Sequence, residues 1–249
     1  MKAAFFDIDG TIYRDSLLTE HFKRLIKYEL IDPRQWENKV KDLHTQWDIR
    51  KGGYDAYLLG LVDSYIEAIQ NVTLEQNEFV ANQVMDVKAG RVYKYTRDRI
   101  KWHRAQGHKI IFISGSPEFL VSKMAEKYGA DDYCGTVYHY DGERFTGETT
   151  PMWDSVSKQK AINKFVEKYN INLEKSYAYG DTNGDLTMMK SVGYPITINP
   201  AKALLKSIQK NKSLKKKIQI ILERKDVIYK LHSNVEIYEC SFIEEWEEE

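Results

Sequence analysis

The sequence predicts an α/β fold, in which helices cover a mostly parallel β-sheet and an all-helical insertion follows the first strand. Over residues 89–200, short apolar runs alternate with helical patterns, which is the order of right-handed βαβ units. Residues 16–88 instead carry apolar residues at helical spacing and hold no strand pattern. The length of 249 residues suits one large domain or a core with an inserted module.

The first predicted strand is the apolar run KAAFFDI, residues 2–8, a pattern typical of a parallel strand buried on both faces. Four helical patterns follow it, separated by Pro33, by the pair Gly52-Gly53 and by the stretch NVT. The insertion is therefore expected to contain four helices. They cover residues 17–31, 33–47, 54–69 and 74–87.

The rest of the chain alternates. Helices are predicted at residues 89–107, 117–129, 157–170 and 184–193, and strands at 108–114, 175–180 and 194–199. Residues 132–148 alternate in polarity around an Asp-Gly turn, which predicts a β-hairpin. The strand at 194–199 is expected to be the last.

These elements divide the chain into a core of residues 1–15 and 89–210, a helical segment of residues 16–88 and a charged C-terminal extension of residues 211–249. Residues 201–232 hold ten basic and two acidic side chains, whereas residues 235–249 hold seven glutamates and no basic residue. The basic stretch 202–225 has apolar residues at helical spacing. Such a helix could lie on an anionic membrane, but we favour a surface helix packed on the core.

The composition excludes several classes of protein. Basic and acidic residues both number 37, so net charge indicates no nucleic-acid partner. Cys134 and Cys240 are the only cysteines, which supports neither a disulfide framework nor a zinc cluster. No apolar run approaches the length of a spanning helix. We expect a cytoplasmic protein, and its oligomeric state is left open.

Four polar clusters follow predicted strands or lie next to them. In an open α/β sheet, ligands bind at the carboxyl ends of the strands, so these clusters are expected to form one site. Each cluster alone has an ordinary structural explanation, such as a helix cap or a solvated lysine. The clusters are Asp7 with Asp9, Ser114 with Gly115, Lys158, and Asp181 with Asp185.

Several carboxylates at one point require a positive partner. With oxygen ligands and no paired His or Cys, Mg²⁺ is the expected ion. A hard cation and a lysine beside a carboxylate favour a phosphate ester as substrate. One carboxylate could then attack phosphorus, and the second, two residues on, could exchange protons with the leaving alcohol and with water.

The motifs DIDGT, FISGS and YGDTNGD resemble those of the haloacid dehalogenase superfamily, in the branch that contains phosphoserine phosphatase. The resemblance covers roughly residues 2–200 and implies a Rossmann-like parallel sheet core with an inserted helical cap. It implies that Asp7 is the nucleophile and a Mg²⁺ ligand. It also implies that Asp9 is the general acid/base and a ligand through its backbone carbonyl.

The resemblance assigns the remaining clusters as well. Ser114, Gly115 and Lys158 would bind phosphate, although Lys160 is a second candidate for the lysine. Asp181 would complete the metal site, and Asp185 would hold a metal-bound water or orient Lys158. Two residues that recognise phosphoserine in the family have no match here: the expected glutamate position is Ser16, and the stretch 54–69 has no arginine.

The sequence thus predicts a Mg²⁺-dependent hydrolase of a small phosphate ester. Two alternatives remain open: a phosphotransferase or mutase with the same intermediate, and a non-catalytic phospho-accepting or binding module. Aromatic residues of the insertion could stack on a cationic head group, but we favour packing among its own helices. They are Trp36, Trp47, Tyr54 and Tyr57, near Arg50.

Overall fold

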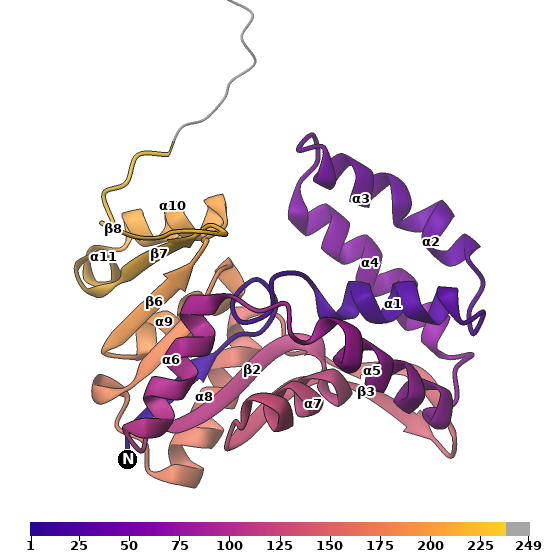
Figure 1. Ribbon diagram of the computed structural model, residues 1–249, viewed down its shortest axis with the longest axis horizontal. Coiled ribbons are helices and arrows are strands. Elements are labelled where there is room, and N and C mark those ends of the chain that lie inside the picture. The colour runs from indigo at the N-terminus through magenta and orange to yellow at the C-terminus, as the bar shows by residue number, and fades with distance from the viewer. Residues whose placement is uncertain (238–249) are drawn as a thin grey trace, which may run out of the picture.

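The computed structural model describes residues 1–237 and contains an eight-stranded sheet with helices on both faces (Figure 1). The strand order is β4-β3-β2-β1-β5-β6-β7-β8. Only the edge strands β4 and β8 pair antiparallel, so the predicted α/β fold with a mostly parallel sheet and a hairpin is confirmed. The strands are β1 (Ala3–Phe6), β2 (Lys109–Pro117), β3 (Asp132–Asp141), β4 (Arg144–Thr150), β5 (Tyr177–Gly180), β6 (Tyr194–Ile198), β7 (Gln219–Glu223) and β8 (Ile228–Leu231).

The longer helices of the core flank the sheet, and five helices precede β2 in the insertion. The helices are α1 (Leu17–Lys27), α2 (Arg34–Lys39), α3 (Lys41–Asp48), α4 (Tyr54–Ile69), α5 (Leu74–Lys88), α6 (Lys94–Ala105), α7 (Glu118–Tyr128), α8 (Ser155–Tyr169), α9 (Leu186–Ser191), α10 (Lys202–Lys210) and α11 (Lys212–Lys217). Helices α1 to α4 gather beyond the β3 side of the sheet, and α10 and α11 lie at its other end (Figure 1).

Strand β1 lies in the middle of the sheet and is buried on both faces. Ala4 and Phe6 pack with residues of α6 and α7, whereas Ala3 and Phe5 pack with residues of α8. This burial explains why the run is apolar at every position rather than at alternate ones. After Lys2, the next polar residue is Asp7, which appears where the strand ends.

The insertion contains five helices where the sequence analysis expected four. The helical pattern at 33–47 divides at Val40, where the backbone leaves ideal helical geometry with φ −117° and ψ −36°. Val40 is fully buried in the apolar cluster of the insertion. Trp36 of α2 and Leu43 of α3, on either side of this break, both pack against that cluster.

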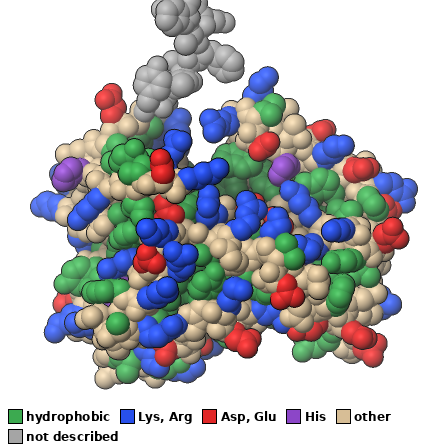
Figure 2. All heavy atoms as spheres, viewed as in Figure 1, with side chains coloured by type: hydrophobic (Ala, Val, Ile, Leu, Met, Phe, Trp, Pro, Cys, Tyr) green, Lys and Arg blue, Asp and Glu red, His purple; other side chains and the backbone are tan. Residues whose placement is uncertain are grey.

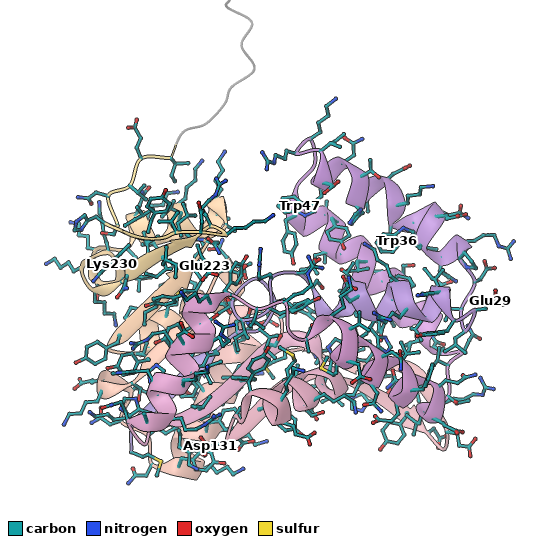
Figure 3. The ribbon with its side chains drawn as sticks, viewed as in Figure 1. Glu29, Trp36, Trp47, Asp131, Glu223 and Lys230 are labelled. Atoms are coloured by element: carbon teal, nitrogen blue, oxygen red, sulfur yellow. The ribbon has the colours of Figure 1, made fainter. Side chains whose placement is uncertain are left out.

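The favoured interpretation of the insertion's aromatic residues, packing among its helices, agrees with most of their contacts. The Trp36 ring meets Phe22 edge-on, and the Trp47 ring lies 5.2 Å from that of Tyr54. Figure 3 labels Trp36 on α2 and Trp47 on α3, and Trp47 is 42% exposed. Tyr57 is buried and pairs with Thr19 at 2.8 Å.

His21 is a buried histidine in this packed region. Its Nδ1 lies 2.9 Å from the Tyr65 hydroxyl, and its ring packs against Phe119. Burial lowers the pKa of His21 from 6.5 to about 3. The folded protein therefore holds this imidazole neutral at pH values where the unfolded chain would protonate it.

We expect acid to weaken the fold through His21. Below pH 6.5 the unfolded state binds the extra proton, so the free energy of unfolding falls with decreasing pH by up to about 1.4 kcal/mol per pH unit until about pH 3. Urea denaturation between pH 7 and pH 5 should show a smaller slope for His21→Gln than for wild type. The exposed His139→Gln serves as control, and an unchanged slope in His21→Gln would contradict the expectation.

The C-terminal part of the sheet corrects the sequence analysis in two ways. The strand at 194–199 is not the last one, because β7 pairs parallel with β6 and β8 pairs antiparallel with β7. The stretch 202–225 is not one helix: Asn211 caps α11, and the chain becomes extended from Ile218. Strands β7 and β8, from the stretch predicted as a charged extension, thus belong to the sheet. The acidic end at 235–249 lies outside the described residues from residue 238 onward.

The apolar side of α10 and α11 is covered by the core. Leu204, Ile208 and Leu214 are buried and cluster with Met189 of α9. This contact explains the helical spacing of these residues without a membrane, since the apolar face is already occupied. Within residues 1–237, none of the helices has the length and apolar character needed to cross a bilayer.

Glu223 links the last parallel strand to the core. Its carboxylate accepts hydrogen bonds from the backbone amides of Lys94 and Tyr95, both at 2.8 Å. These amides open α6 and have no partner within the helix. Figure 3 places Glu223 between β7 and α6.

We expect Glu223→Ala to lower the free energy of unfolding by about 1 kcal/mol, the usual cost of losing a helix cap. Urea denaturation at neutral pH measures it. The exposed Glu126→Ala in α7 is the matched control and should change stability by less. Equal effects of the two substitutions would show that Glu223 does not cap α6 in solution.

Candidate active site

Three neighbouring strands bring the predicted polar clusters together. Strands β2, β1 and β5 are adjacent and parallel, so their carboxyl ends meet at one edge of the sheet. Asp7 follows β1, Ser114 lies in the second half of β2, and Asp181 follows β5. The topology therefore joins residues that are far apart in the sequence.

The turn after β1 depends on glycine. Gly10 has φ +74°, a conformation that side chains disfavour. A Cβ atom at this position would lie 2.0 Å from Oδ2 of Asp181. The turn closes through backbone hydrogen bonds from Gly10 to Tyr13 and from Ile12 to Ile8. Only glycine lets the chain bend here and still admit Asp181.

Lys158 connects two carboxylates at the floor of the site. Its Nζ donates to Oδ1 of Asp7 at 2.8 Å and to Oδ1 of Asp185 at 2.6 Å, and all three side chains are buried. Lys158 reaches the site from the first turn of α8, which Asp154 caps through the amides of Val156 and Ser157. The neighbouring Lys160 is exposed and takes no part in this group.

Asp7, Asp181 and Asp185 each offer an oxygen atom within 4.8 Å of the others. Both oxygens of Asp185 are engaged, Oδ1 by Lys158 and Oδ2 by the amides of Asp181 and Thr182. Thr11 donates to Oδ1 of Asp181 at 3.1 Å. Among the described residues, no donor contacts Oδ2 of Asp7 or Oδ2 of Asp181. These two carboxylates therefore keep an oxygen free for a cation.

The buried carboxylates of the cluster repel one another, so a positively charged ligand would stabilise them. Burial raises the pKa of Asp7 to about 7, although Lys158 partly opposes the shift. Burial and the neighbouring Asp7 raise the pKa of Asp181 well above its ordinary value. Burial alone would lower the pKa of Lys158, but the carboxylates of Asp185 and Asp7 raise it. A hard divalent cation fits this all-oxygen donor set.

Asp9 lies beside the cluster but its side chain is held separately. Its Oδ1 accepts a hydrogen bond from the amide of Leu17 at 3.1 Å, and its Oδ2 accepts one from the Ser116 hydroxyl at 2.5 Å. Burial raises the pKa of Asp9 to about 6. The two contacts fix the carboxyl group at the start of α1, facing the same cavity as Asp7.

The end of β2 forms another wall of the site. Ser114 is fully buried, and its Oγ accepts a hydrogen bond from the amide of Ser116 at 3.2 Å. Thr136 donates to the carbonyl of Gly115 at 2.7 Å, which fixes the peptide that follows Gly115. Trp153 lies directly against Gly115. Ser114 and Gly115 thus line the cavity near Asp7 and Lys158.

A cavity of about 310 Å³ opens above these groups. The ends of β1 and β2 form one side of the cavity. The other side is formed by α1, by α4 and by the loop that contains Trp153, between β4 and α8. In Figure 2 the surface is hollowed between the helical insertion and the C-terminal strands, and hydrophobic side chains are visible on its wall. The cavity could hold a small molecule with one end at the carboxylates.

The structure brings together all seven residues that the sequence analysis selected, and it adds others. Ser116 contacts Asp9, Thr11 contacts Asp181, and Trp153 borders Gly115. Ser116 could have been suspected from its position two residues after Ser114 in FISGS. Nothing in the sequence marks Trp153 or the wall of α4, because their role depends on how the insertion folds over the core.

Comparison with known proteins agrees with this geometry. A sequence profile described as haloacid dehalogenase-like hydrolase matches residues 4–190, three quarters of the chain. The chain belongs to the haloacid dehalogenase-like hydrolases. A second profile of the same description matches residues 151–238. The resemblance noted from the three motifs is thereby confirmed.

Among curated relatives of this hydrolase, an "inhibition of morphological differentiation protein" of Streptomyces azureus is 29% identical over 206 residues, covering 81% of this chain and 73% of that protein. A phosphoserine phosphatase of Methanocaldococcus jannaschii is 23% identical over 231 residues, covering 91% and 94% of the two chains. A solved structure described as a phospho-aspartyl intermediate analogue of phosphoserine phosphatase shares the fold, with a TM-score of 0.60, 21% identity and coverage of 90% and 94%.

Proposed function

We propose that this hydrolase is a Mg²⁺-dependent phosphomonoester hydrolase that acts through an aspartyl-phosphate on Asp7. The observation that carries the proposal is the environment of the Asp7 carboxylate. It lies at the floor of a cavity, is bound by the buried Lys158, and faces Asp181 with one oxygen uncontacted by the described residues. Relatives that carry phosphatase names, including phosphoserine phosphatase, support the same class of reaction.

Asp7 and Asp181 would hold Mg²⁺ through their free oxygens, together with the backbone carbonyl of Asp9. When bound, the ion would offset the negative charge of the phosphate oxygens. Asp185 would orient Lys158, because both of its own oxygens are already engaged. This assignment follows from which oxygens remain available.

Lys158, Ser114 and the amide of Gly115 would bind the phosphate group. An ammonium group has three protons, and Asp7 and Asp185 accept two of them. The third proton of Lys158 is available to a phosphate oxygen. Lys158 would thus stabilise the charge that develops as phosphorus is attacked.

The reaction would proceed in two steps. In the first, an oxygen of Asp7 forms a bond to phosphorus while the ester P–O bond breaks, and Asp9 gives its proton to the leaving alcohol. In the second, water attacks phosphorus and gives a proton to Asp9, while the bond between Asp7 and phosphorus breaks and releases phosphate. The contacts of Asp9 with Leu17 and Ser116 would hold it in position for both proton transfers.

The helical segment of residues 16–88 would act as a cap that covers the substrate and limits access of water. Its apolar cluster includes Tyr138 and Phe145 of the hairpin, so the segment rests on β3 and β4. Residues 1–15 and 89–210, joined by the sheet strands β7 and β8, would form the catalytic core. The substrate would be a small metabolite of the cytoplasm. The half-buried thiol of Cys134 is free, as is usual for cysteines in that reducing compartment.

We expect phosphate release from generic esters such as p-nitrophenyl phosphate to require Mg²⁺. Purified protein would be assayed by phosphate detection after chelation with EDTA, and again after Mg²⁺ is restored. Activity should fall to background and then recover. Release that survives chelation would contradict the metal assignment. Transfer to an added alcohol, without release to water, would favour the phosphotransferase alternative.

A further inference from the structure

The side of the cavity that faces away from the carboxylates is apolar. Helix α4 supplies Tyr54, Leu58, Val62 and Ile66, which recur every four residues and so line one face of the helix. Leu59 also borders the cavity although it is 63% exposed. Apolar side chains that border a cavity and remain exposed form a surface to which a ligand can bind. The alcohol portion of a phosphate ester could cover this surface.

The cavity is poor in positive charge. Among the described residues that line it, Lys158 is the only Lys, Arg or His, whereas three carboxylates line it: Asp7, Asp9 and Asp63. Lys158 is already bound to Asp7 and Asp185. A carboxylate on the alcohol portion of a substrate would therefore lie in the cavity without a cationic partner, which costs free energy.

Asp63 gives the apolar wall a single charge. It follows Leu59 by one helical turn on α4, borders the cavity and is exposed at its rim. No ion pair joins Asp63 to any of the described residues. A cationic group at the far end of a ligand could reach this carboxylate while its apolar body lies along α4.

We infer that the substrate is a phosphate monoester whose alcohol portion has an apolar body and a cationic amine but no carboxylate. The inference rests on the proposed function and specifies its substrate class. The phosphate would lie at Lys158, the apolar body on α4 and the amine at Asp63. Phosphoserine, which carries a carboxylate and little apolar surface, does not fit this description.

Three aryl phosphates with closely similar leaving groups test the inference. Tyramine phosphate carries the amine alone, phosphotyrosine adds a carboxylate, and 4-ethylphenyl phosphate lacks both. In wild type with Mg²⁺, kcat/KM for tyramine phosphate should exceed that for phosphotyrosine by about tenfold or more, which corresponds to about 1.4 kcal/mol. It should exceed that for 4-ethylphenyl phosphate by about threefold or more, a ratio suited to a partly exposed ion pair.

Two variants on α4 assign the effect to residues. Asp63→Asn should lower the ratio of kcat/KM for tyramine phosphate to that for 4-ethylphenyl phosphate toward one. Leu59→Arg should raise the ratio for phosphotyrosine to tyramine phosphate about tenfold, because it supplies the missing cation. The matched controls Asp42→Asn and Val87→Arg change exposed residues that do not line the cavity and should leave both ratios unaltered.

The outcomes separate this inference from the proposed function. If wild type hydrolyses phosphotyrosine and tyramine phosphate with equal kcat/KM, the exclusion of carboxylates is overturned while phosphatase activity stands. If tyramine phosphate and 4-ethylphenyl phosphate react equally, the amine assignment is overturned. If neither these esters nor p-nitrophenyl phosphate release phosphate, the proposed function fails and the inference fails with it.

Discussion

Asp7→Asn is expected to lower phosphate release by at least about a thousandfold, since it removes the attacking carboxylate and substitutes an amide that is a poor nucleophile. The substitution keeps the shape of the side chain and an oxygen that can accept the hydrogen bond from Lys158. Loss of activity should therefore occur in a folded protein. Phosphate release under Mg²⁺ saturation measures the effect, and circular dichroism with thermal unfolding verifies the fold.

The control for Asp7→Asn is Asp86→Asn, which changes an exposed carboxylate of α5 in the same way. It should retain wild-type activity. A second readout concerns the intermediate: wild-type protein quenched in acid during turnover should carry a phosphoryl group, and Asp7→Asn should not. Substantial turnover by Asp7→Asn would show that another group attacks phosphorus.

Lys158→Met is expected to have the second largest effect, on both activity and stability. Methionine fills a similar volume but leaves Asp7 and Asp185 buried without their cation. Breaking a buried ion pair in this way costs about 3–5 kcal/mol. Phosphate release should fall by at least about a hundredfold, because the charge on the phosphate oxygens loses a donor in the transition state. Urea denaturation and phosphate assays measure the two effects.

Lys160→Met provides the matched control, two residues along the same helix. Lys160 is exposed, so its substitution should alter the free energy of unfolding by less than about 0.5 kcal/mol and leave activity near wild type. The comparison distinguishes the two lysines that the sequence offers for phosphate binding. A larger loss of activity in Lys160→Met than in Lys158→Met would reverse the assignment.

Local patterns in the sequence were sufficient for the main architecture and for the choice of site residues. The continuous apolar run that contains β1 indicated a central strand, because a strand covered on both faces cannot alternate in polarity. The sequence alone predicts that Asp7, Ser114 and Asp181 lie close together, because neighbouring parallel strands end at the same edge of the sheet. These inferences succeed because they rest on burial and chain direction, which are encoded within a few residues.

The C-terminal region shows where local patterns are insufficient. The spacing of Ile218 and Ile221 fits a helix, yet both belong to an extended segment whose strand β7 pairs with β6. Backbone pairing with a strand already in place outweighs the local helical preference of a lysine-rich stretch. A similar limit applies at Val40, where the predicted helix at 33–47 divides into α2 and α3 although no Pro or Gly marks the break.

The sequence alone therefore determined the fold class, the family and the candidate carboxylates and lysine, since these follow from apolar runs, from short motifs and from polar residues that follow strands or open a helix. Only the tertiary structure decided which oxygens of Asp7, Asp181 and Asp185 stay free and that Ser116 holds Asp9. It also decided that α4 presents Leu59 and Asp63 to the cavity. These properties arise from contacts between segments distant along the chain, where distance and direction in space, rather than spacing in sequence, set the chemistry.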